Sequence, residues 1–320
     1  MQFIGQEDVA AALPWLDLIE AIESTLVSPL AVAPDRTVHT VTVGEGRADA
    51  SLLLKPGWVI GDVIAVKVVA FFPENGSLDL PTVNAGVLLF DGSNGTLLGA
   101  CDGNELTARR TAAASAVAAK RLARQDSKRL LVVGTGAVAP MAALAHGAVR
   151  DYDLVEVWGR NAVKAAAVVE VLRAAGLEAR TSTDLDTSVA AADVISTVTG
   201  ATSPLIKGAL LREGTHVDLV GSFTPSMRES DDDVIRRASV WVDSRGDGLL
   251  AGDLAQPIAA GLMTEADIEG DLVDLINGTS PGRGSEEEIT VFKSAGLALE
   301  DVAAARLVFG GNDGSDQIIG

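Results

Sequence analysis

The chain has little cysteine, few aromatic residues and few histidines, and each shortage excludes something. Its single cysteine, Cys101, rules out an intrachain disulfide and any zinc site built on two or more cysteines. The three histidines, at positions 39, 146 and 216, lie far apart in the sequence, so no metal site is predicted. Aromatic residues make up only 4% of the chain, so the core must be built from Ala, Val, Leu and Ile.

Positive charge is also scarce, because 25 basic residues face 44 acidic ones and the formal net charge is −19. Such a surface repels phosphate backbones, so no nucleic-acid partner is predicted. The charge-free stretch 130–149 approaches the length of a membrane span, but it is rich in Gly and Ala and contains Pro140, so a buried strand followed by a buried helix is favoured. The N-terminus has no basic region followed by an apolar run. We therefore expect a soluble, cytoplasmic protein without a signal peptide.

The first hundred of the 320 residues predict an α+β domain with a largely antiparallel sheet. Residues 14–23 carry apolar groups at helical spacing. Apart from Lys67, the run 63–69 is β-branched or apolar, as a strand requires. Residues 83–90 and 96–101 flank a Gly- and Asn-rich turn that is typical of a hairpin.

After an Ala-rich helical segment that begins at Thr107, predicted strands and helices alternate. This alternation predicts βαβ units and a doubly wound parallel sheet, so the fold class is α/β with a second, α+β domain. The predicted strands are 130–133, 154–158, 193–198, 215–220 and 239–243, and the predicted helices are 139–148, 162–175 and 206–212.

A Gly-x-Gly-x-x-Ala turn connects the first strand of this region to its helix. Gly134 permits a tight turn, Gly136 removes the Cβ that would block a pyrophosphate, and Ala139 lets the helix approach the strand. The turn follows a strand, opens a helix and precedes a second strand at the right distance, which is the context of a dinucleotide site. The residues predicted to bind the dinucleotide here are Gly134, Thr135, Gly136, Ala137 and Val138.

The end of the second strand indicates which dinucleotide binds. An NAD site usually places Asp or Glu there for the ribose hydroxyls, but Glu156 comes too early, inside the strand. Arg160, with Asn161 beside it, offers a guanidinium to a 2′-phosphate, which favours NADPH over NADH; a surface arginine at a strand end would give the same pattern. Later strand ends add three more predicted cofactor residues, Thr197, Thr199 and Gly221.

Several segments together resemble the ornithine cyclodeaminase/mu-crystallin family, over about residues 3–309. They are Pro34-Asp-Arg36, Val66-Lys67-Val68, Leu106-Thr-Ala-Arg-Arg110-Thr-Ala-Ala, Gly134-Thr-Gly-Ala-Val-Ala, Trp158-Gly-Arg-Asn, Val220-Gly-Ser-Phe-Thr-Pro and Phe292-Lys-Ser-Ala-Gly. The resemblance implies a substrate-binding and dimerisation domain over 1–120 and 285–310, an NADP(H)-binding Rossmann domain over 121–284, and a homodimer that pairs through the sheets of the first domain. Residues 311–320, rich in Gly and Asp, are expected to be disordered.

The resemblance also implies that Arg36, Lys67 and Arg110 hold the α-carboxylate of an amino or imino acid. Their chemistry agrees, because the planar fork of arginine matches a carboxylate and a second cation fixes its orientation. Lys67 lies in an otherwise apolar run, where a lysine is costly without a partner. From the pattern alone, Lys67 on a solvent-facing strand and Arg110 as a solvated helix charge stay open as alternatives.

One departure from the family pattern bears on the reaction. Cyclodeaminating members carry an aspartate after the matching strand, and this chain has Phe223 there, which we expect to form an apolar wall to a ring. Phe223 and Arg160 favour NADPH-dependent reduction of 1-pyrroline-2-carboxylate or 1-piperideine-2-carboxylate to L-proline or L-pipecolate, with Lys67 as the catalytic residue that manages the imine proton. The alternatives are an ornithine cyclodeaminase, an amino-acid dehydrogenase of the alanine type, and an NADPH-gated protein that binds a small ligand without turnover.

Overall fold

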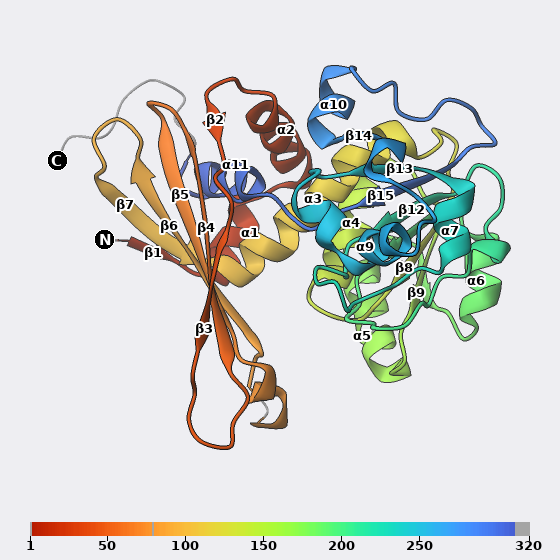
Figure 1. Ribbon diagram of the computed structural model, residues 1–320, viewed down its shortest axis with the longest axis horizontal. Helices are drawn as coiled ribbons and strands as arrows, with labels where there is room; N and C mark the ends of the chain where they lie inside the picture. The colour runs from red at the N-terminus through yellow and green to blue at the C-terminus, as the bar shows by residue number, and fades with distance from the viewer. Residues whose placement is uncertain (1, 79, 311–320) are drawn as a thin grey trace. The chain divides into compact units, whose positions relative to one another are not determined.

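The computed structural model describes residues 2–78 and 80–310, which fall into two compact units (Figure 1). Unit 1 takes in the described residues of 1–110 and 298–320, and unit 2 is residues 111–297. The tail 311–320, for which disorder is expected, lies outside the described residues. Among the described helices, none combines the length and the apolar character that crossing a membrane requires.

In the described part of the chain, unit 1 contains a seven-stranded sheet of order β1-β7-β6-β5-β4-β2, with β3 paired to β4. All its pairs are antiparallel except that of β1 with β7. The strands are β1 (Gln2–Ile4), β2 (Ala31–Val32), β3 (Thr37–Val41), β4 (Ala50–Val59), β5 (Val63–Phe71), β6 (Val83–Asp91) and β7 (Leu97–Asp102). The predicted antiparallel hairpin is β6 and β7. On β5, Val63, Ala65 and Lys67 are buried and alternate with half-buried neighbours, so Lys67 points to the covered face of the sheet.

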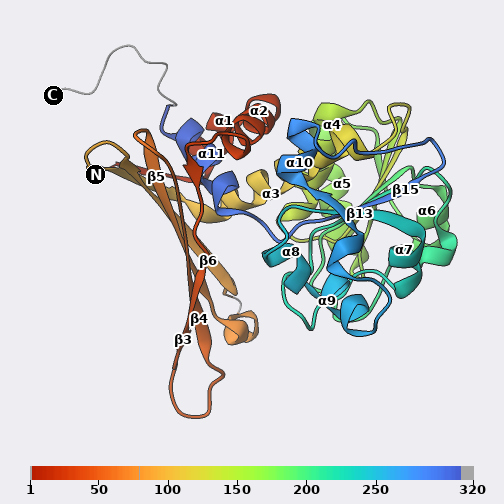
Figure 2. The same cartoon turned by 45° about the horizontal axis from the view of Figure 1, so that its top comes forward.

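The helices of unit 1 lie on one face of this sheet (Figure 2). They are α1 (Gln6–Ala12), α2 (Trp15–Leu26) and α11 (Ala298–Val308), with a 3₁₀ turn, η1 (Pro73–Leu78). Helix α11 packs against α2, β4 and β5. It can approach β4 because residue 57 is glycine: a Cβ there would lie only 2.9 Å from Cγ2 of Val302. This close approach brings the first turn of α11 onto the face that carries Lys67.

Helix α3 (Gly103–Leu122) is divided between the two units, because the boundary falls after Arg110. Every residue from Ala112 to Ala119 is buried, and most of them are alanine. Side chains this small allow the surrounding elements of unit 2 to pack closely on the helix.

Unit 2 contains, among its described residues, an eight-stranded parallel sheet of order β10-β9-β8-β11-β12-β15-β13-β14. Its strands are β8 (Arg129–Val133), β9 (Leu154–Trp158), β10 (Ala179–Thr181), β11 (Val194–Thr197), β12 (His216–Leu219), β13 (Ala238–Val242), β14 (Ile268–Asp271) and β15 (Ile289–Lys293). Alternate residues of β8 enter two different core clusters, Leu130 and Val132 in one and Leu131 and Val133 in the other. Both faces of the sheet are therefore buried, as the predicted α/β fold requires.

Strand β15 differs from the expectation that residues 285–310 all belong to the first domain. It lies between β12 and β13 in the middle of the parallel sheet of unit 2, and the chain returns to unit 1 only at Ala298. The reason is that Ile289, Val291 and Phe292 are all buried, as suits a central strand covered on both faces.

The helices of unit 2 follow the predicted alternation, with one exception. They are α4 (Val138–Val149), α5 (Ala162–Ala174), α6 (Leu185–Ala191), α7 (Asp232–Arg237), α8 (Asp247–Leu250), α9 (Gly252–Ala259) and α10 (Leu272–Asn277), with 3₁₀ turns η2 (Gly208–Leu210) and η3 (Glu265–Asp267). The helix predicted over 206–212 is wrong, because only the short turn η2 forms. Ile206 forms a bridge with Ser230, and Gly208 lies so close to α7 that a Cβ would be 2.2 Å from the carbonyl carbon of Asp233. The chain is held extended along α7 instead.

Candidate active site

The Gly-rich turn between β8 and α4 has the geometry of a phosphate cradle. Gly134 has φ 137°, and a Cβ there would lie 2.7 Å from the carbonyl oxygen of Val198, so only glycine fits. A Cβ on Gly136 would meet no atom within 4 Å, which means that the missing side chain keeps the space before the turn open. No described side chain caps the start of α4 at Ala137. The backbone N of Ala139 donates to the carbonyl oxygen of Gly136 (3.0 Å) and Pro140 has no N–H, so the N–H groups that can meet an anionic ligand are those of the turn before Ala139.

A cavity of about 620 Å³ opens in front of this turn, entirely within unit 2. Three chain segments line it: the turn itself, the end of β9 with the start of α5, and the loop after β11. The lining residues include Gly134, Thr135, Gly136, Arg160, Asn161, Lys164 and Thr199. The lining contains two basic side chains and no acidic one, so the cavity suits a ligand with several phosphates.

The end of β9 is built as the sequence predicts. Glu156 is buried and forms ion pairs with Arg129 (3.1 Å) and Arg180 (3.0 Å), so it cannot meet a ribose. The Oδ1 atom of Asn161 accepts hydrogen bonds from two backbone N–H groups of α5, at 3.0 and 3.1 Å. This cap fixes the turn that presents Arg160 to the cavity.

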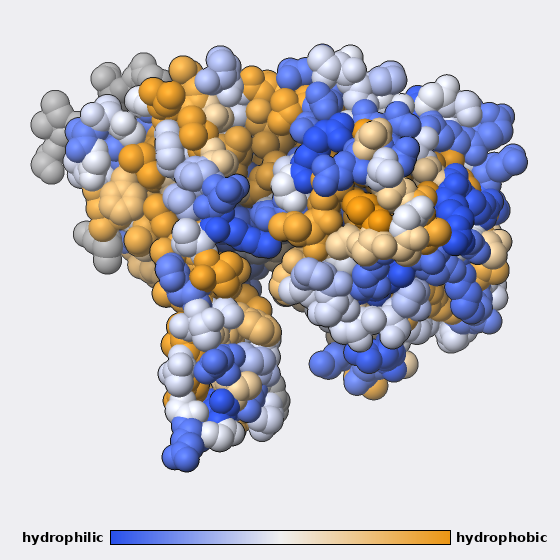
Figure 3. All heavy atoms as spheres, in the orientation of Figure 1, coloured by the Kyte–Doolittle hydropathy of each residue, from blue (hydrophilic) through white to orange (hydrophobic). Residues whose placement is uncertain are grey.

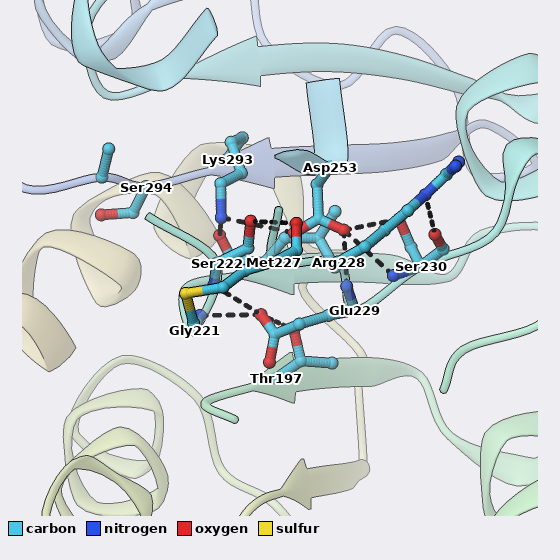
Figure 4. A network of polar contacts seen from close by, with 12 residues as sticks. Thr197, Gly221, Ser222, Met227, Arg228, Glu229, Ser230, Asp253, Lys293 and Ser294 are labelled. Carbon is cyan, nitrogen blue, oxygen red and sulfur yellow. Dashed lines mark hydrogen bonds and ion pairs between the residues drawn. The ribbon is translucent and has the colours of Figure 1, made fainter. Parts of the chain in front are cut away.

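Beneath the cavity, the carboxylate of Glu229 collects hydrogen bonds from the ends of β11 and β12 (Figure 4). Its Oε1 accepts from the backbone N (2.7 Å) and Oγ1 (2.8 Å) of Thr199, and its Oε2 accepts from Oγ1 of Thr197 (2.9 Å) and the backbone N of Gly221 (2.7 Å). The two strand-end loops touch here, because a Cβ on Gly221 would lie 2.1 Å from the carbonyl oxygen of Thr199. Thr197 is fully buried, so it supports the cavity from behind and does not line it, in contrast to the expectation.

A second layer holds Glu229 itself. Its backbone N donates to Oδ1 of Asp253 on α9 (2.8 Å), and Nζ of Lys293 lies 3.0 Å from the carbonyl oxygen of Leu219 and 3.5 Å from Oδ2 of Asp253. Burial and the nearby Asp253 raise the pKa of Glu229, while Lys293 opposes that rise. Sequence reasoning missed Glu229 and Asp253, because no spacing in the sequence indicates that they meet the loop donors.

In unit 1, Lys67 and Arg110 meet on one carboxylate. Nζ of Lys67 lies 2.7 Å from Oδ1 of Asp301, and Nε of Arg110 lies 2.8 Å from the same oxygen. The Arg110 guanidinium also pairs with Glu300. Lys67 is 2% exposed and Arg110 is 4% exposed, which excludes the alternatives of a solvent-facing strand lysine and a solvated helix charge.

This environment changes the acidity of Lys67. Burial, followed by the positive charge of Arg110, lowers the pKa of Lys67 to about 7, with Asp301 acting in the opposite direction. Lys67 is therefore a group that can exchange a proton near neutral pH.

The remaining predicted residues lie in different units. Arg36 lies in unit 1 between β2 and β3 and is half-buried, and Phe223 lies in unit 2 in the loop after β12, where its side chain is 50% exposed. Among the described residues, no group of three or more His, Cys, Asp and Glu side chains is arranged to hold a metal ion.

Sequence reasoning missed three charged members of the unit 1 cluster: Lys55, Glu300 and Asp301. All three are buried. Asp301 lies 234 positions from Lys67 in the sequence, so only the return of α11 to the sheet reveals the pair. A signal was available for Lys55, which stands in a strand-like run just as Lys67 does.

Comparison with known proteins identifies relatives that cover nearly the whole chain. The model of the ornithine cyclodeaminase/mu-crystallin family matches residues 2–315. The Delta(1)-pyrroline-2-carboxylate reductase of Paracoccus denitrificans is 37% identical over 309 residues, 96% of each chain. The ketimine reductase mu-crystallin of Mus musculus is 38% identical over 252 residues, 78% of this chain and 76% of the relative.

A solved structure agrees with these relatives. The Thermococcus litoralis Delta(1)-pyrroline-2-carboxylate reductase, in complex with NADH and L-proline, superimposes with a TM-score of 0.90. It is 32% identical, and the match covers 97% of each chain.

Glu229→Gln tests whether the carboxylate under the cavity positions its loops. We expect the affinity for a nicotinamide dinucleotide to fall about tenfold, because an amide offers one acceptor oxygen and turns an NH₂ group toward the loop donors. Binding is measured by fluorescence titration of the cofactor. Glu178→Gln, at an exposed glutamate of the same unit, serves as the control. Equal affinities in the two variants would show that Glu229 does not hold the site.

Proposed function

Because the chain belongs to the ornithine cyclodeaminase/mu-crystallin family, we propose that it is an oxidoreductase that reduces the C=N bond of a cyclic imino acid with NADPH. The substrates are 1-pyrroline-2-carboxylate or 1-piperideine-2-carboxylate, and the products are L-proline or L-pipecolate. The observation that carries the proposal is the likeness, over 96% of both chains, to a protein named Delta(1)-pyrroline-2-carboxylate reductase.

The cofactor binds in the cavity of unit 2. The Gly134–Val138 turn at the start of α4 holds the pyrophosphate, and Arg160 with Asn161 meets the 2′-phosphate. Thr199 and Gly221 are held in place for the nicotinamide half by Glu229. When bound, NADPH supplies the hydride.

The substrate is held by the cations of unit 1. Arg36, Lys67 and Arg110 bind its α-carboxylate, and Lys67 also manages the proton at the imine nitrogen. Asp301 supports this role, because it fixes the ammonium of Lys67 and the guanidinium of Arg110 relative to each other. Buried, fixed cations orient a carboxylate without having to be ordered during the reaction.

Phe223 favours reduction over cyclodeamination. Deamination needs a group that accepts an amine proton and a nucleophile at the carbon, and a phenyl ring supplies neither. Phe223 instead forms an apolar wall for the methylene groups of the ring. Its half-exposed side chain can contact a ligand without first being uncovered.

The proposed reaction is tested by turnover. We expect NADPH oxidation with either cyclic imino acid and no matching release of ammonia from ornithine, followed by nicotinamide absorbance and an ammonia assay. Lys67→Met should lower kcat/KM at least about a hundredfold, since loss of one side of a buried charge pair costs roughly 3 kcal/mol or more. The control is Lys128→Met, at a half-exposed lysine of unit 2. If ornithine releases ammonia as fast as the imine is reduced, the activity is cyclodeamination and the proposal is wrong. If Lys67→Met keeps the native kcat/KM, Lys67 is not part of the active site.

Cofactor choice is tested at Arg160. The native protein should prefer NADPH over NADH, and Arg160→Ala should abolish that preference, because a charge-assisted pair is worth about 1.5–3 kcal/mol, or roughly ten- to a hundredfold in affinity. KM values for both cofactors provide the measurement. Arg173→Ala, which removes a half-exposed arginine from α5, should leave the preference intact. Equal use of both cofactors by the native protein would contradict the assignment.

We further propose a homodimer formed through unit 1. Apolar side chains stand exposed on this unit, many of them on its strands: Phe3, Leu30, Val38, Ile60, Phe71, Val83 and Leu97. Apolar surface also gathers over these strands in Figure 3. Several exposed apolar side chains on one sheet are typical of a protein interface.

Light scattering at micromolar concentration should give twice the 32.9 kDa mass of the chain. Val38→Asp should weaken the dimer, because it places a charge in the proposed apolar interface, whereas Val163→Asp, at a more exposed valine of unit 2, should not. A monomeric native protein would refute the dimer. If the two variants have the same mass by light scattering, the interface does not include Val38.

A further inference from the structure

Two lysines lie directly opposite each other in the sheet of unit 1. The antiparallel register of β4 and β5 pairs Lys55 with Lys67, and their side chains are only 7% and 2% exposed. Directly opposed residues have Cβ atoms about 5 Å apart, and like charges in such a pair are destabilising. A sequence selected only for stability would avoid two opposed lysines. Residues that lower the stability of a fold in this way are found mainly at functional sites.

The other charges around Lys67 come from the two helices that reach this face. Helix α3 contributes Arg110, and α11 contributes Asp301, which contacts Lys67, and Glu300, which pairs with Arg110. On the other side of β5, the residue opposite Lys67 is the apolar Val87 of β6. Burial is the largest cause that lowers the pKa of Lys67; the charge of Arg110 lowers it further, that of Asp301 raises it, and that of Lys55 lowers it by a smaller amount.

Resting on the proposed function, we propose that Lys55 is a positioning residue whose charge, set opposite Lys67, keeps the Lys67 ammonium ready to release its proton to the imine nitrogen. An ordinary lysine has a pKa near 10.4 and holds its proton too firmly to be an efficient acid at neutral pH. A neighbouring cation is one established way of loosening that proton. Asp301 holds the ammonium in position, and Lys55 offsets the extra stabilisation that this carboxylate gives to the charged form.

The proton and electron balance is complete. The imine carbon receives a hydride, with its electron pair, from the reduced nicotinamide, which becomes oxidised. The C=N π pair passes to the nitrogen and forms a bond to the proton that leaves Nζ of Lys67. The product is the secondary amine, and the neutral Lys67 regains a proton from water before the next turnover.

The first measurement is made on the protein without cofactor or substrate. Lysine labelled with ¹³C at Cε allows the titration of Lys67 to be followed by NMR, and the Lys67→Met spectrum identifies its signal. Lys55→Met, which keeps the length of the side chain and removes its charge, should raise the pKa of Lys67 by about one unit or more. Lys55→Arg, which keeps the charge, should leave it near the native value. Arg47→Met removes a positive charge at a 44% exposed position of unit 1 and should have no effect.

The second measurement is the pH dependence of kcat/KM for imine reduction. In Lys55→Met, the pH above which kcat/KM falls should rise by the same amount as the pKa of Lys67. Lys55→Arg and Arg47→Met should keep the native pH profile. If Lys55 had only a structural role, its loss would change kcat/KM equally at all pH values and would not shift the pH at which kcat/KM falls.

The inference is overturned if Lys67 titrates at the same pH with and without the Lys55 charge, or if its titration moves and the limb does not. Lys55 also favours the charged form of Asp301, so thermal unfolding checks that Lys55→Met is folded, and Lys55→Gln provides a second neutral variant that keeps hydrogen-bonding groups. A native protein that reduces no cyclic imine would defeat the proposed function. An active enzyme in which Lys67 does not respond to Lys55 would defeat this inference alone.

Discussion

One carboxylate oxygen, Oδ1 of Asp301, is the contact on which the buried charges of unit 1 depend. It is shared by the Lys67 ammonium and the Arg110 guanidinium, and all three side chains are buried. Removing one partner of a buried ion pair costs about 3–5 kcal/mol, because the other charge is left uncompensated. Loss of Asp301 would leave Lys67 without its carboxylate, whereas Arg110 would keep its ion pair with Glu300. The position of α11 on the sheet is therefore set by apolar packing at Gly57 and also by the need to neutralise β5 and α3.

Unit 2 also contains a buried carboxylate, which connects two loops instead of neutralising cations. Glu229 is buried and acidic, and the donors that converge on it are mostly loop backbone and hydroxyl groups, with no cation in direct contact. A carboxylate satisfied in this way ties two strand ends together, so the loops beside the cavity are fixed before any ligand arrives. In unit 2 the carboxylate lies behind a cavity lined by two basic side chains and no acidic one, in a chain of net charge −19.

The parallel sheet and the Gly-rich turn could be predicted from the sequence because each is encoded locally, whereas the set Arg36, Lys67 and Arg110 came from the family resemblance, and the structure brings together only Lys67 and Arg110. Strand and helix periodicity reveals β8, α4 and β9, and glycine spacing reveals the cradle. The partners of the cations could not be predicted in this way. Asp301 and Glu229 each meet residues brought together only by the tertiary fold, and β15 was assigned to the wrong unit because its sequence runs on into α11. Lys67 was recognised because a charge in an apolar run is conspicuous. Lys55 stands in a similar run, but only the register of β4 and β5 shows that it lies opposite Lys67.

The route of the chain through unit 1 has a consequence for synthesis. Residues 111–297 form a contiguous unit, whereas unit 1 is divided between residues before 111 and the segment that starts at Ala298. A ribosome therefore releases all of unit 2 before it releases α11. Until then, Lys67 and Arg110 lack the carboxylates that neutralise them, so unit 1 cannot form its final core. A chain that stops before Ala298 would contain all of unit 2 and would lack the carboxylates that pair with Lys67 and Arg110 in unit 1.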